Sequence, residues 1–130
     1  MFNNVHVLII DDNYEDADIL SEILGTLDVT YDVISNTSLI KTELDLVPVP
    51  SVIFLDLELP GTTGFEVLDF IRNHARMADV PVVAYSSHST EKPGVRKSDF
   101  SGFLGKPLDS TRVKEFLRRV LDGEKVWDLW

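Results

Sequence analysis

Four short runs of mostly apolar residues recur along the chain and indicate buried β-strands. They occupy residues 5–10, 51–56, 80–85 and 102–105. The first three are expected to be central strands of a parallel sheet, because helices cover both faces of such a sheet and its strands are apolar throughout. Residues 30–34 alternate between polar and apolar side chains, which is typical of an edge strand.

Helical periodicity fills most of the segments between these strands. Apolar residues recur there at three- and four-residue spacings, as they do on one face of an amphipathic helix. Helices are predicted over about residues 14–27, after Asp12 or Asn13; from Asn36 or Thr37 to before Pro48; over about 65–74; and from Asp109 or Ser110 to Gly123. Strands that alternate with helices in this way predict βαβ units and an α/β fold.

Residues 89–100 depart from this alternation. A helix is expected at this point, but Pro93 and Gly94 lie in the middle of the segment and Val95 is its only aliphatic residue. In a helix interior a proline costs roughly 3 kcal/mol and a glycine about 1 kcal/mol. We therefore predict a short, displaced or irregular fourth helix.

The composition narrows the classes of function. With 130 residues, of which 44% are hydrophobic, the chain is expected to form one domain with a substantial core. The absence of cysteine excludes disulfides and thiolate metal sites. A formal charge of −10 argues against binding to nucleic acid or to anionic membranes. No apolar run approaches the ~18 residues of a membrane span, and the N-terminus lacks the pattern of a signal peptide, so a cytoplasmic location is expected.

Polar residues with useful chemistry follow the carboxyl ends of the four apolar runs. They are Asp11 and Asp12, Asp56, Ser86, and Lys106. In an open α/β sheet these strand ends form one edge, where ligands bind. Oxygen ligands without His or Cys favour Mg²⁺ or Mn²⁺, and a lysine ammonium suits a phosphoryl oxygen. The set predicts a carboxylate that accepts a phosphoryl group with the help of a divalent metal.

Four motifs contain these residues: Leu8-Ile-Ile-Asp-Asp12, Phe54-Leu-Asp-Leu-Glu-Leu-Pro-Gly61, Tyr85-Ser-Ser87 and Phe103-Leu-Gly-Lys-Pro107. In this order, each at a strand end, they make the chain resemble the receiver domain of bacterial two-component response regulators over essentially its whole length. The resemblance implies a doubly wound five-stranded parallel sheet in the order 2-1-3-4-5. It also implies a signalling protein, rather than an enzyme, that assists only its own phosphorylation and dephosphorylation.

The resemblance further implies a role for each polar residue of the motifs. Asp56 is the expected phosphoacceptor. Asp11, Asp12, Asp56 and the backbone carbonyl of Glu58 would hold Mg²⁺ or Mn²⁺; Lys106, Ser86 and Ser87 would lie against the phosphoryl group; Ser86 and Phe103 would form the switch; the bond before Pro107 would be cis; and Glu58 and His88 would tune the lifetime of the phosphate.

Simpler hypotheses remain open for several of these residues. Asp11 and Asp12 could be helix-capping acids, Glu58 a plain surface acid, and Phe103 an ordinary packing residue of an edge strand. A haloacid-dehalogenase-type phosphatase would also use Asp56 as its nucleophile, although such enzymes need more chain. A scaffold that never carries phosphate is a third hypothesis, against which the complete acid set and Lys106 argue.

The expected organisation is a receiver domain at residues 1–123 and a C-terminal tail at 124–130, with no output domain. A histidine kinase or a phosphotransfer protein would donate the phosphoryl group. The signal would then pass to an unidentified protein target, and a homodimer is possible. The tail contains Trp127, Leu129 and Trp130. Either Trp127 packs onto the last helix, or the aromatic residues of the tail form an exposed anchor for a partner.

Overall fold

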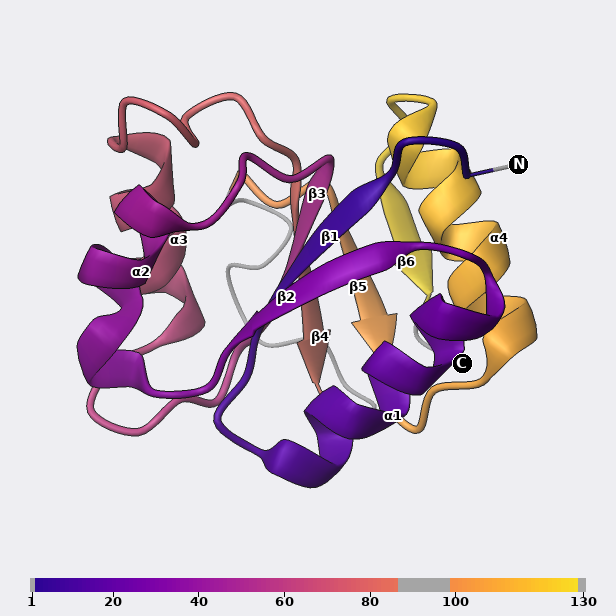
Figure 1. Cartoon of the computed structure of the whole chain (residues 1–130), viewed down its shortest axis with the longest axis horizontal. Helices are drawn as coiled ribbons and strands as arrows, with labels where there is room; N and C mark the ends of the chain where they lie inside the picture. Colours follow the sequence, from indigo (N-terminus) through magenta and orange to yellow (C-terminus); the bar gives the residue numbers. More distant parts are fainter. Residues whose placement is uncertain (1, 87–98, 129–130) are drawn as a thin grey trace.

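A six-stranded parallel sheet forms the centre of the computed structural model, which describes residues 2–86 and 99–128 (Figure 1). The strands are β1 (His6–Ile10), β2 (Thr30–Ile34), β3 (Val52–Asp56), β4 (Val82–Ser86), β5 (Gly102–Gly105) and β6 (Val126–Asp128). Their order is β2-β1-β3-β4-β5-β6, and each neighbouring pair is parallel. The predicted order 2-1-3-4-5 is confirmed, and the sheet has one strand more than predicted.

Helices cover both faces of the sheet, as a doubly wound fold requires. Helices α2 (Ile40–Leu46) and α3 (Gly64–Arg72) lie on one face, and α1 (Tyr14–Thr26) and α4 (Ser110–Leu121) lie on the other (Figure 1). A short 3-10 helix, η1 (Thr37–Leu39), leads into α2. Helix α3 ends at Arg72, slightly before the predicted end.

Polar side chains just before these helices set where they begin. Asn13, Asn36, Thr63 and Asp109 each accept a hydrogen bond from a backbone N–H of the first turn that follows. These amides have no partner within the helix, so a side-chain acceptor at the cap stabilises the start of the helix. Because Asn13 caps α1, the carboxylate of Asp12 is not needed for that purpose.

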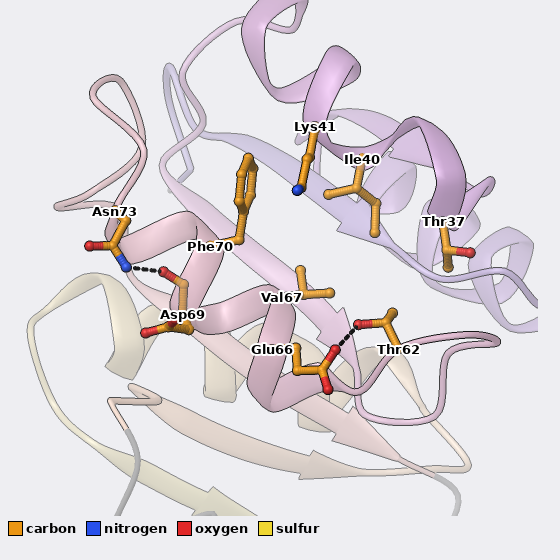
Figure 2. Close-up of a pocket in the computed structure, with 9 residues that line it drawn as sticks. All are labelled: Thr37, Ile40, Lys41, Thr62, Glu66, Val67, Asp69, Phe70 and Asn73. Atoms are coloured by element: carbon orange, nitrogen blue, oxygen red, sulfur yellow. Dashed lines mark hydrogen bonds between the residues drawn. The ribbon is translucent and has the colours of Figure 1, made fainter.

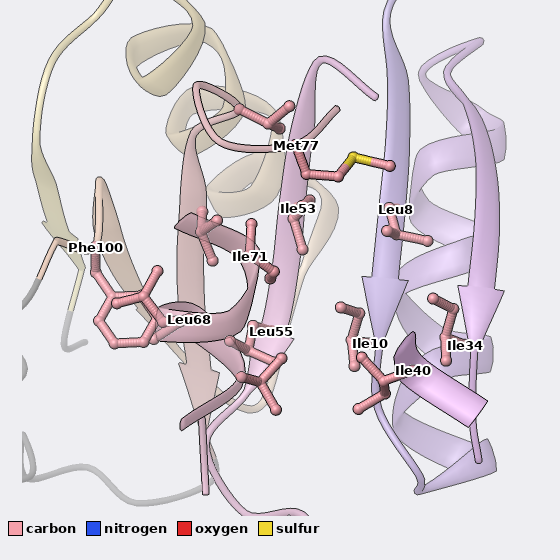
Figure 3. Close-up of a cluster of buried hydrophobic side chains, with 14 of the residues drawn as sticks. Leu8, Ile10, Ile34, Ile40, Ile53, Leu55, Leu68, Ile71, Met77 and Phe100 are labelled. Carbon is pink, nitrogen blue, oxygen red and sulfur yellow. The ribbon is translucent and has the colours of Figure 1, made fainter. Parts of the chain in front are cut away.

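Successive strand residues pack on opposite faces of the sheet, which creates two hydrophobic clusters. Figure 3 shows the cluster under α2 and α3, where Leu8, Ile53 and Leu55 of the strands meet Ile40 and Ile71 of the helices. The opposite cluster contains Val7, Ile9, Phe54, Leu104, Leu20 and Phe116, among others. Burial on both faces explains why β3 and β4 are buried at every position. It also holds the carboxyl ends of the strands in fixed relative positions.

The sixth strand lies in the segment that was expected to be a tail. Val126 pairs with Gly102 and Trp127 with Phe103. Val126 is buried in the cluster under α1 and α4, whereas Trp127 is half-buried against the cluster that contains Phe103. Trp127 is therefore a half-buried residue of the sheet and not a stop on the last helix, while Leu129 and Trp130 lie outside the described residues.

Gly102 makes this strand pairing possible. A Cβ atom at Gly102 would lie 2.6 Å from the carbonyl oxygen of Val126 and 3.1 Å from the ring of Phe116. Contacts this short require the neighbours to move, so the absence of a side chain lets β6 and α4 approach β5.

The predicted irregular helix at residues 89–100 lies mostly outside the described residues. At the end of that segment, Phe100 is buried and meets the ring of Phe65 at a centroid distance of 6.0 Å. Arg72 forms an ion pair with Asp99 and donates a hydrogen bond to the carbonyl oxygen of Val80. These contacts join the chain that enters β5 to α3.

Candidate phosphoacceptor site

The predicted site residues converge on the carboxyl edge of the sheet. Asp11 directly follows β1, Asp56 ends β3, Ser86 ends β4 and Lys106 directly follows β5. Since all these strands are parallel and adjacent, their ends bring the four side chains to one place. The same geometry was the basis of the prediction from sequence.

Three carboxylates gather tightly at this edge. One oxygen from each of Asp11, Asp12 and Asp56 lies within 4.8 Å of the others. Asp11 and Asp56 are buried and Asp12 is half-buried. An oxygen-only donor set of this kind suits a hard divalent cation such as Mg²⁺. The three acids therefore fit the predicted metal.

Burial strongly affects the protonation of Asp56. Its pKa is raised from 3.8 to about 7, mainly because burial removes hydration; Asp11 adds to the rise, and the Glu58 backbone N–H and the Lys106 charge oppose it. The Glu58 N–H donates to Oδ1 of Asp56 at 3.1 Å and so fixes the orientation of that carboxylate. Without a cation, burial and the neighbouring Asp11 thus disfavour the ionised form that a nucleophile needs.

Lys106, directly after β5, lies close to two of the three clustered carboxylates. Its Nζ lies 3.5 Å from Oδ2 of Asp11 and 3.8 Å from Oδ2 of Asp56, and the residue is 7% exposed. Its shortest ion pair is with Asp16, at 2.7 Å. Asp16 was not among the predicted site residues, since an acid in the first turn of a helix is common for its favourable interaction with the helix dipole.

Tyr85 is a second site residue that the sequence analysis missed. Its phenol donates a 2.5 Å hydrogen bond to Oδ2 of Asp11, and Lys106 Nζ lies 4.5 Å from the centre of its ring. Burial and the nearby charge of Asp11 raise the Tyr85 pKa above its ordinary value, so the phenol stays protonated and acts as a donor. Its place directly before Ser86 on an otherwise aliphatic strand was the available signal.

Ser86 and Glu58 contact each other at the same edge. Ser86 Oγ donates to Oε1 of Glu58 at 3.2 Å, and the Ser86 carbonyl oxygen accepts a hydrogen bond from the Lys106 N–H at 2.8 Å. Phe103 is fully buried opposite Ala84 of β4. Because side chains alternate along a strand, Ser86 faces the same side of the sheet as Ala84 and hence as Phe103.

Of the remaining predicted site residues, Pro107 is described by the structure, whereas Ser87 and His88 are not. The Lys106–Pro107 peptide bond is cis, as predicted. Arg112 of α4 donates to the carbonyl oxygens of Pro107 and Gly105, at 2.8 Å and 3.0 Å, and so braces this loop. Ser87 and His88 lie outside the described residues.

A separate pocket of about 500 Å³ lies between α2 and α3 (Figure 2). Polar and apolar side chains both line this pocket. The Nζ atom of Lys41 lies 5.3 Å from the centre of the Phe70 ring, and the Thr62 hydroxyl donates a 2.9 Å hydrogen bond to the Glu66 carboxylate. None of the acid-cluster residues lines this pocket. We therefore assign the chemistry to the sheet edge and not to this pocket.

Comparisons with known proteins show the family to which the chain belongs. A family model of the response regulator receiver domain matches residues 7–118. The two-component response regulator ORR5 of Oryza sativa subsp. japonica is 30% identical over 118 residues, which cover 89% of this chain and 88% of that protein.

Solved structures show the same fold. A signal receiver domain of a two-component histidine kinase from Clostridium thermocellum superposes with a TM-score of 0.77 at 25% identity, covering 91% of this chain and 98% of that one. The chemotaxis response regulator CheY4 of Vibrio cholerae gives a TM-score of 0.79 at 20% identity, covering 89% and 98%.

The chain belongs to the response regulator receiver domain family of two-component systems. Receiver domains are signalling domains that bind Mg²⁺ at an acidic site and interact with histidine kinases or phosphotransfer proteins. The matches do not favour the haloacid-dehalogenase alternative. Among the described residues, none of the helices has the length and apolar character needed to span a bilayer.

Proposed function

We propose that Asp56 accepts a phosphoryl group from the phosphohistidine of a histidine kinase or a phosphotransfer protein, with Mg²⁺ bound beside it. The observation that carries the proposal is the meeting of three carboxylates and the Lys106 ammonium at one sheet edge. The signal then leaves through contact with a protein target. We count β6 as part of the receiver unit, because it pairs with β5.

The transfer is an in-line displacement at phosphorus. A carboxylate oxygen of Asp56 forms the new O–P bond while the P–N bond to the donor histidine breaks, and the imidazole leaves with that electron pair. Lys106 provides a positive charge for the phosphoryl oxygens, and the Glu58 N–H holds the attacking carboxylate in one orientation. Catalysis of this kind rests on positioning and charge neutralisation rather than on covalent help from other residues.

The metal would be held by Asp11, Asp12, Asp56 and the backbone carbonyl of Glu58. When bound, the cation supplies positive charge beside the phosphoryl oxygens and lowers the pKa of Asp56. In this arrangement Tyr85 and the Asn13 N–H each donate to one oxygen of Asp11, so that carboxylate is already oriented.

Ser86 and Phe103 are the proposed switch. The hydroxyl of Ser86, which now donates to Glu58, would turn to an oxygen of the phosphoryl group, and Phe103 would repack on the same side of the sheet. Ser87 would also lie against the phosphoryl group. Glu58 and His88 would flank the water that hydrolyses the aspartyl phosphate and would thereby set its lifetime.

Acetyl phosphate and intact-mass measurement test the acceptor assignment. The wild type should gain one phosphoryl group with Mg²⁺ and none with EDTA, and Asp56→Asn should gain none. Asp69→Asn, a change at an exposed acid on α3, is the matched control and should load as the wild type does. An equal yield of adduct on Asp56→Asn would refute the assignment.

A further inference from the structure

The Lys106 ammonium is bound more closely by Asp16 than by the proposed phosphoacceptor. Nζ lies 2.7 Å from Asp16, 3.5 Å from Asp11 and 3.8 Å from Asp56. Asp16 lies in the first turn of α1, where its backbone N–H bonds to the cap residue Asn13, so its position is set by the helix. The Asp16 side chain is 31% exposed, whereas that of Lys106 is 8% exposed. The partner that holds the ammonium most tightly is therefore the one nearest to solvent.

The Lys106 ammonium also lies over the aromatic ring of Tyr85. With Nζ 4.5 Å from the centre of the ring, the geometry is that of a cation–π contact. Burial alone would lower the Lys106 pKa, but the hydrogen bond to Asp16 and the charges of Asp56 and Asp11 outweigh it and raise the pKa above its ordinary value. Lys106 is thus a charged group that donates a hydrogen bond to Asp16 and forms longer ion pairs with Asp11 and Asp56.

We propose that Asp16 competes with the phosphoryl group for the Lys106 ammonium and so limits how fast Asp56 is loaded. The inference rests on the proposed function, because it describes the regulation of that same site. Lysine has three N–H donors, and the shortest of its contacts here goes to Asp16. A phosphoryl group arriving at Asp56 must draw the ammonium toward itself, away from Asp16. It must also approach a fourth carboxylate, whose charge repels it.

Asp16 is on this account a positioning residue that acts through Lys106. Replacing it with Asn keeps the shape of the side chain and removes the charge. The ammonium would then be shared between Asp11 and Asp56, whose side chains are less exposed than that of Asp16. Loading should become faster, and the contact between Lys106 and the phosphoryl group should form more readily.

The first test measures initial rates of phosphorylation by acetyl phosphate at fixed Mg²⁺. Asp16→Asn should raise the rate at least about threefold, as expected when one charge is removed a few ångströms from an arriving anion. Asp18→Asn, which removes an exposed charge from the same helix, should leave the rate unchanged. A rate for Asp16→Asn that is unchanged or lower would overturn the proposal.

A double-mutant cycle shows whether the effect runs through Lys106. The acceleration by Asp16→Asn should disappear, or fall to a small remainder, when it is measured in a Lys106→Met background. If the full acceleration persists there, Asp16 acts only as a general negative charge and the proposal is wrong.

A readout that needs no phosphorylation separates this inference from the proposed function. In ¹⁵N-labelled protein, the ammonium protons of Lys106 should exchange slowly with water in the wild type and in Asp18→Asn, and faster in Asp16→Asn. Faster exchange, together with a wild type that never loads phosphate, would refute the proposed function and leave the Asp16–Lys106 contact standing. Equal exchange in all three proteins would refute the contact itself.

Discussion

The phenol of Tyr85 donates a 2.5 Å hydrogen bond to Asp11, and both residues are fully buried. A buried carboxylate is costly unless charges or donors compensate it. Asp11 has two such donors, the Tyr85 hydroxyl at Oδ2 and the Asn13 N–H at Oδ1, together with the Lys106 ammonium at 3.5 Å. The protein thus stabilises a dense cluster of acids with neutral donors as well as with one cation.

Removal of the Tyr85 hydroxyl group should destabilise the protein. Tyr85→Phe keeps the ring but leaves Asp11 without one donor, and a hydrogen bond to a charged group contributes about 1.5–3 kcal/mol. We expect a loss of that size in the free energy of unfolding by urea, measured at pH 8 in EDTA. Tyr14→Phe, at a residue that is 71% exposed, is the control. Equal losses for the two variants would mean that the hydrogen bond adds nothing.

Much of the site could be predicted because the chemistry follows the strands. Asp11, Asp56, Ser86 and Lys106 each come directly after a recognisable apolar run or end one, and parallel strands must bring such positions to one edge. The order of the strands came from the resemblance of four complete motifs to one family. Neither step needed any knowledge of how individual side chains pack.

The contacts of Asp16 with Lys106 and of Tyr85 with Asp11 could not be predicted from the sequence. They depend on how far side chains extend from one helix or strand to another, and the periodicity of apolar residues carries no such information. Asp16 has the pattern of an ordinary helix-terminal acid, and Tyr85 that of a core residue. The strand β6 was missed for a different reason: it has three residues, which is too few for an alternating pattern to be recognised. Its pairing depends on Gly102, a residue that the sequence analysis treated only as part of a strand.

Asp56 should make stability depend on pH in a direction opposite to that of an ordinary ion-paired acid. Its pKa is raised from 3.8 to about 7, mainly by burial, so the folded state holds the proton more tightly than the unfolded state. Between these two values the contribution of Asp56 to the free energy of unfolding falls as the pH rises. Asp56→Asn removes the titrating group and should therefore be more stable than the wild type at pH 8.

Urea unfolding from pH 4 to pH 8 in EDTA measures this difference. The gap between Asp56→Asn and the wild type should widen as the pH rises to about 7 and then level off. Added Mg²⁺ should narrow it at pH 8, because a bound cation favours the ionised carboxylate. Curves that stay parallel over the whole range would show that Asp56 titrates normally.

Gly102→Ala should separate β6 from β5. The new Cβ would lie 2.6 Å from the Val126 carbonyl oxygen, and overpacking of this kind costs about 1–3 kcal/mol. In a Trp130→Phe background, release of the strand should move the fluorescence of Trp127 to longer wavelength. Gly25→Ala is the control: no atom lies within 4 Å of its new Cβ, and alanine in a helix should stabilise by up to about 1 kcal/mol. A folded Gly102→Ala protein with an unshifted spectrum would contradict this account.

Ser86→Ala tests whether the hydroxyl at the end of β4 couples the site to Phe103. The hydroxyl now donates to Glu58 and faces the same side of the sheet as the fully buried Phe103 ring. If it turns to the phosphoryl group when Asp56 is loaded, Phe103 repacks with it, as expected for two packed arrangements whose populations shift. The Ala variant should still bind beryllofluoride, a phosphoryl mimic, but the ring resonances of Phe103 should move much less than in the wild type. Ser101→Ala, at the half-buried serine just before β5, should respond as the wild type does. Equal shifts of Phe103 in Ser86→Ala and in the wild type would show that the ring senses the site by another route.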